Sequence, residues 1–155
     1  MPRTDTRYVT VRIAIAFLVL GVLGLFVTPA SAQTTPKQKV VVHLTHYTDQ
    51  LHAVKMAVHL AHVMQTLGAE VTLLLDLEGV RLASTKEPQS LIWGKGEPIS
   101  VEYDAFVKAG GRVLLCPHCA EHAGITERGL RAGAQLGKEG ALAKTVLAAD
   151  KVLDY

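Results

Sequence analysis

The sequence predicts an α/β protein: a single three-layer domain with a mainly parallel five-stranded sheet and helices on both faces. Two short apolar runs, KVVVHL at residues 39–44 and EVTLLL at residues 70–75, are typical of strands that are buried on both sides. Segments with helical spacing of apolar residues separate the expected strands from one another. Such alternation favours a parallel sheet whose connections cross its faces.

The other elements follow in order along the chain. A helix is expected over residues 51–67, with Asp49 as its N-cap and Gly68 at its end. Proline and glycine interrupt residues 80–98, which we expect to form a loop that shelters at most a short helix. The later pattern predicts helices over residues 99–109, 120–123 and 139–149, and strands over residues 112–115, 133–136 and 151–155.

Residues 1–32 have the pattern of a secretory signal peptide. Basic residues precede an apolar stretch at residues 13–27, and Ala30-Ser31-Ala32 provides a small-x-small cleavage site. We expect cleavage after Ala32, a polar tether over residues 33–38, a domain over residues 39–155, and a periplasmic or secreted location. The alternative is an uncleaved signal, which would be the protein's one attachment to a membrane.

Composition argues against a nucleic-acid-binding protein. Without residues 1–32 the chain loses three arginines and one aspartate, which leaves equal numbers of basic and acidic residues. It keeps only five aromatic residues and has no basic stripe. A domain of this length can bury one ordinary core without a framework of disulfides.

The only two cysteines lie in the motif Cys116-Pro117-His118-Cys119, directly after the strand expected at residues 112–115. Free backbone N–H groups and the helix dipole favour the thiolate form of a thiol between a strand and a helix. A protonated His118 would also stabilise a neighbouring thiolate. The motif is open to three functions, which are a sulfur carrier, a dithiol–disulfide redox centre and half of a metal site. An inert structural pair is the remaining alternative.

Seven histidines raise the metal alternative. His52, Met56 and His59 follow one stripe of the first expected helix, and His46 precedes that helix. Together with the two cysteines they would offer thiolate, thioether and imidazole ligands, which suit Cu(I) or Zn(II). For each histidine the alternative is a surface or hydrogen-bonded role.

One edge of the predicted sheet should collect most of the polar candidates. Sites in parallel sheets gather beyond the carboxyl ends of the strands. His43 and His46, Asp76 and Glu78, and the cysteine motif all lie at such ends. His43 also interrupts a buried strand, so it is either a satisfied core histidine or a residue of the site.

The ordered motifs resemble the DsrE/DsrF/TusD family of small sulfur-handling proteins. The second half matches through VLLC ending at Cys116, Ala123-Gly124, GKEGALA at residues 137–143 and DKV at residues 150–152; the first half matches through VVVHLT and VTLLLDLEGV. The resemblance implies a DsrE-like, flavodoxin-like fold with a persulfide carried on Cys116. It also implies a sulfur-donor or thiol protein partner, and a homo-oligomer such as a trimer or hexamer.

Three features depart from the family pattern. Cys119 adds a second thiol that can resolve a Cys116 persulfide into a disulfide, and Glu121 and His122 stand where TusD-like members have paired arginines. The predicted export also separates the protein from a cytoplasmic relay. We therefore expect an exported sulfur carrier or sulfurtransferase-like protein in which Cys116 reacts, assisted by Cys119 and His118. The alternative is a periplasmic protein that binds copper or zinc.

Overall fold

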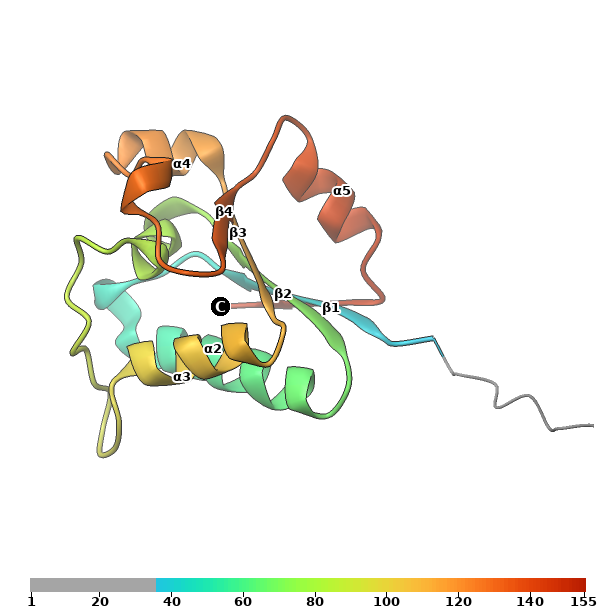
Figure 1. Ribbon diagram of the computed structural model, residues 1–155, viewed down its shortest axis with the longest axis horizontal. Coiled ribbons are helices and arrows are strands. Elements are labelled where there is room, and N and C mark those ends of the chain that lie inside the picture. The colour runs from blue at the N-terminus through green and yellow to red at the C-terminus, as the bar shows by residue number, and fades with distance from the viewer. Residues whose placement is uncertain (1–35) are drawn as a thin grey trace, which may run out of the picture. The chain divides into compact units, whose positions relative to one another are not determined.

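The computed structural model describes residues 36–155, which form one five-stranded sheet with the strand order β4-β3-β2-β1-β5 (Figure 1). All four strand pairings are parallel. The predicted secretory signal and the first half of the tether, residues 33–35, lie outside these residues. The strands are β1 (Lys39–Leu44), β2 (Glu70–Leu75), β3 (Arg112–Leu115), β4 (Ala134–Leu136) and β5 (Lys151–Asp154).

Helices lie on both faces of the sheet, which confirms the three-layer prediction. Figure 1 shows α2 and α3 side by side on one face and α5 on the other. No helix within residues 36–155 is long and apolar enough to cross a membrane. The α-helices are α2 (Leu51–Thr66), α3 (Ile99–Lys108), α4 (Pro117–His122) and α5 (Ala141–Leu147), and the 3₁₀ helices are η1 (Thr48–Gln50), η2 (Leu77–Ala83) and η3 (Glu127–Gly129).

The main core lies between the sheet and the α2–α3 layer. Alternate residues of a strand point to opposite faces, and Val40 and Val42 of β1 belong to this core. Helix α2 contributes Val54, Val58 and two alanines, which recur at helical spacing and are fully buried. Burial of each such valine stabilises the fold by roughly 1.5–3 kcal/mol. The apolar pattern of the sequence thus determines which face of α2 meets the sheet.

Glu102 of α3 anchors the polar side of α2. Its carboxylate accepts hydrogen bonds from Lys55 Nζ at 2.6 Å and from His59 Nδ1 at 2.7 Å. His62 Nδ1 lies 3.9 Å from the same carboxylate. Burial raises the pKa of Glu102, but the bonds from Lys55 and His59 outweigh burial and leave it lowered. Two of the first-helix histidines therefore serve the packing of α2 on α3.

Two local predictions were wrong. Asp49 is not the N-cap of the long helix, because it lies within η1 and its carboxylate accepts the Tyr47 N–H at 2.8 Å; Gln50 precedes α2 without a side-chain cap. The brief helix expected at residues 120–123 begins instead at Pro117. Proline favours the first turn of a helix because its φ is preset and its missing N–H would have had no partner there.

Candidate functional site

The cysteine motif forms the junction between β3 and α4. Cys116 is the N-cap of α4, and its N–H donates to the carbonyl of Leu75 at 2.8 Å, which extends the β2–β3 pairing by one residue. Its own carbonyl accepts the N–H of Ala120 at 2.9 Å. Both cysteines are free, half-buried thiols. The predicted strand-to-helix position of the motif is confirmed.

Cys119 lies one turn into α4 and faces the end of β2. Burial raises the pKa of the Cys119 thiol, and the nearby Cys116 thiol and the charge of Asp76 act in the same direction. The backbone N–H of Leu77 opposes them, because it donates to the Cys119 sulfur. The net effect is upward, so Cys119 is protonated near neutral pH.

The backbone that carries this amide is strained. Within residues 36–155, Leu77 is the one non-glycine residue with a positive φ, at 46°. Its side chain is 62% exposed, so apolar burial of this side chain does not offset the energy of the left-handed backbone. Such a residue costs roughly 1–3 kcal/mol and needs support from its surroundings. Gly79 of η2 provides this support, because its backbone N–H donates to the carbonyls of Asp76 at 2.8 Å and Thr45 at 3.1 Å.

His43 links three neighbouring strands at the same edge. Its Nδ1 is 2.7 Å from Asp154 Oδ1 on β5, and its Nε2 is 3.1 Å from Asp76 Oδ1 at the end of β2. Burial lowers the pKa of His43, but the two carboxylates outweigh burial and leave it raised. The contact to Asp76 is poorly directed, and Asp76 Oδ1 remains buried without a hydrogen bond in the described part of the chain. His43 is thus both a satisfied histidine and a residue of the edge that carries the cysteines.

A shallow depression of about 310 Å³ opens beside α4. Cys119 lines it together with Leu77, Arg81, His118 and His122, whereas Cys116 is not among its lining residues. Arg81 is held by Glu78 at 2.7 Å and Glu87 at 3.0 Å. The depression therefore gives a small molecule access to Cys119, with two exposed imidazoles at its rim.

The other histidines proposed as metal ligands have separate partners. His46 Nδ1 pairs with Asp49 at 2.6 Å, and the His52 ring stacks on Trp93 with centroids 3.9 Å apart. His59 pairs with Glu102, and Met56 is half-buried. No three His, Cys, Asp or Glu side chains of residues 36–155 form a group able to hold a metal ion. The structure does not bring these residues and the two cysteines into one cluster.

Two participants of the edge were missed from the sequence. Asp154 could have been found, because it lies at the carboxyl end of a parallel strand and pairs in register with His43. The Leu77 amide had no such signal, since leucine gives no indication of a left-handed backbone. The predicted gathering of His43, Asp76 and the cysteines at one edge follows from the observed register.

A model of the DsrE/DsrF-like family matches residues 38–155. The chain belongs to the DsrE/DsrF-like family. Two solved structures have the DsrE-like fold seen here. The YchN protein from E. coli is 23% identical with a TM-score of 0.58, and MTH1491 from Methanobacterium thermoautotrophicum is 11% identical with a TM-score of 0.56. Each comparison covers 77% of this chain and all of the other. No curated protein matches the sequence.

Proposed function

We propose that this DsrE-like protein is a thiol sulfur carrier in which Cys116 accepts sulfur and Cys119 resolves the product. The Cys116 thiolate attacks the outer sulfur of a small persulfide, R–S–SH, and displaces the thiol R–SH. The product is a persulfide on Cys116. An acceptor thiol then takes the outer sulfur and regenerates Cys116, so no net oxidation occurs.

Cys119 provides a second outcome. Its thiolate attacks the inner sulfur of the Cys116 persulfide, the sulfur–sulfur bond breaks, and hydrosulfide leaves with the proton that Cys119 loses. The products are hydrogen sulfide and a Cys116–Cys119 disulfide. A new cycle then requires two electrons from an external dithiol.

The main support is that two free thiols lie in one motif of a DsrE/DsrF-like protein: Cys116 at the end of a strand, and Cys119 with a raised pKa. A thiol that stays protonated near neutral pH reacts slowly, as a resolving thiol should, because the thiolate is the nucleophile. The Leu77 amide then stabilises the Cys119 thiolate when it forms. His118, exposed between the cysteines, is proposed to assist the neighbouring thiolate.

The proposal includes the setting in which this chemistry takes place. We propose export through residues 1–32, assembly as a homo-oligomer, and a thiol protein as sulfur donor or acceptor. A protein outside the cytoplasm meets oxidising conditions, so a dithiol there needs a reducing partner to complete each cycle.

Binding of copper or zinc is the competing proposal. Cys116 and Cys119 are soft ligands, and a metal would have to recruit the histidines from their present partners. Metal analysis of protein purified without oxygen, with the intact mass before and after a sulfane-sulfur donor, separates the two functions. A carrier holds no stoichiometric metal; it gains the mass of one sulfur atom in the Cys119→Ser variant and forms the Cys116–Cys119 disulfide in the natural protein. Stoichiometric copper or zinc that is lost in Cys116→Ser would overturn the carrier as the main function.

A further inference from the structure

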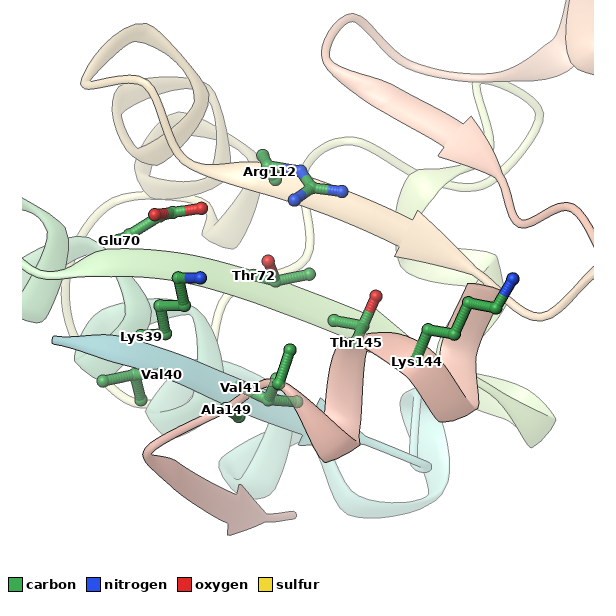
Figure 2. A pocket seen from close by; sticks show the side chains of 10 residues that line it. Lys39, Val40, Val41, Glu70, Thr72, Arg112, Lys144, Thr145 and Ala149 are labelled. Carbon is green, nitrogen blue, oxygen red and sulfur yellow. The ribbon is translucent and has the colours of Figure 1, made fainter. Parts of the chain in front are cut away.

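A second hollow lies at the opposite edge of the sheet, near the amino ends of β1, β2 and β3 (Figure 2). Its volume is about 200 Å³. The charged groups around it are Lys39, Arg112, Lys144 and Glu70. Parallel strands rise by roughly 3.3 Å per residue, so the length of β1 or β2 separates this hollow from the cysteine edge.

The sequence explains why this hollow is open and charged. Alternation along the strands places Lys39 of β1, Thr72 of β2 and Arg112 of β3 on the face that meets α5. Helix α5 has only seven residues, about 10 Å at 1.5 Å per residue, and presents Thr145 to the hollow; Ala148 and Ala149, directly after the helix, add only small side chains. The short helix leaves the amino end of this face uncovered, and Lys144 lines the hollow from the α5 side (Figure 2).

The charges of the hollow are not neutralised by one another. None of the ion pairs within residues 36–155 includes Lys39, Arg112, Lys144 or Glu70. A further carboxylate, Asp150, accepts the backbone N–H of Lys39 at 2.7 Å. Three cations thus face two carboxylates in and beside the hollow, which leaves an excess of one positive charge for a ligand.

A hydroxyl without a protein partner lies at the base of the hollow. Thr72 is only 5% exposed as a whole residue and lines the hollow, and its hydroxyl has no hydrogen-bond partner among the described residues. The hydroxyl is therefore free to donate to a ligand in the hollow. In register, Thr72 lies between Val41 of β1 and Arg112 of β3, which places this donor beside a guanidinium group.

We propose that this hollow binds a small oxyanion of the phosphate or sulfate class. Guanidinium and ammonium groups are the side chains that recognise such anions, and the three cations outnumber the two nearby carboxylates. The Thr72 hydroxyl donates a hydrogen bond from below, while Lys39, Arg112 and Lys144 approach from the sides. The site is separate from the cysteines and does not depend on the sulfur chemistry proposed for them.

Isothermal titration calorimetry of the full-length protein tests this site with inorganic phosphate and with sulfate at constant ionic strength. Both anions should bind once per chain, and chloride should not compete at the same concentration. Arg112→Ala and Lys144→Ala should each weaken binding about tenfold, which corresponds to the loss of one charge-assisted hydrogen bond. Lys95→Ala, which removes an exposed cation outside the hollow, should leave the affinity unchanged.

Thr72→Val tests the role of the Thr72 hydroxyl with a side chain of the same shape. It should weaken sulfate binding while the circular dichroism spectrum stays native. The absence of binding to the unmodified protein would overturn the proposal. An equal loss of anion affinity in Lys95→Ala and Lys144→Ala would also overturn it, because binding would then depend only on the overall charge of the protein.

Discussion

Gly79→Ala tests whether η2 must lie against β1 to support the strained Leu77. A Cβ at residue 79 would lie 2.2 Å from the carbonyl oxygen of Leu44, whereas ordinary contact begins at 3.4 Å, so the chain must shift by about 1.2 Å. The obstacle is backbone of a central strand, which cannot rotate away. Overpacking costs about 1–3 kcal/mol, and a weakened hydrogen bond to Thr45 adds about 1 kcal/mol. We expect a total loss of about 2–4 kcal/mol in the free energy of unfolding.

Urea unfolding followed by circular dichroism measures this loss, and Gly129→Ala is the matched control. A Cβ at Gly129 meets nothing closer than Thr126 Oγ1 at 3.9 Å, and Gly129 has no left-handed φ. That variant should be neutral or more stable by up to about 1 kcal/mol, because alanine restricts the unfolded chain. A loss below about 0.5 kcal/mol in Gly79→Ala, or equal losses in both variants, would refute the reasoning.

Two further predictions concern pH. Glu102→Gln should cost about 1–2 kcal/mol at neutral pH. Because the pKa of Glu102 is lowered on folding, this loss of stability relative to the natural protein should shrink in unfolding experiments as the pH falls below 4.5. Glu97→Gln, an exposed control, should cost under about 0.5 kcal/mol. A loss in Glu102→Gln that does not change with pH would contradict the ion-pair account. Asp154→Asn should lower the pKa of His43, as followed by the NMR shift of its ring proton. Since the folded pKa of His43 is raised, the stability that protonated His43 adds to the fold is fully present below pH 6.5 and is lost as the pH rises through the folded pKa. An unchanged His43 titration in Asp154→Asn would show that the Asp154 carboxylate has no influence.

Most of the fold could be predicted because the central strands and α2 are buried. Burial leaves near-continuous apolar runs in β1 and β2 and a helical stripe in α2, and both patterns are visible in the sequence. Short exposed elements were located less well. The cap expected at Asp49 failed because its carboxylate has a closer donor in the Tyr47 amide.

The site could be predicted only as far as parallel topology determines it. The carboxyl ends of neighbouring strands bring His43 to Asp76 and Asp76 to the cysteine motif whatever the side-chain details. The partners of the helix histidines could not be predicted, because His59 depends on Glu102 of another helix and His52 on Trp93 of a distant loop. Spacing on one helix shows which side chains share a face, but tertiary packing decides what they meet.

The central claim is that Cys116 accepts sulfur and Cys119 resolves it. The most direct measurement is intact mass together with released hydrogen sulfide, after a small persulfide is added without oxygen to the natural protein and to the Cys119→Ser and Cys116→Ser variants. Cys119→Ser should hold one added sulfur atom on Cys116 and release no hydrogen sulfide until a thiol is added. The natural protein should release one equivalent and form the disulfide. A stable added sulfur on Cys119 in Cys116→Ser, with none on Cys116 in Cys119→Ser, would contradict the assignment.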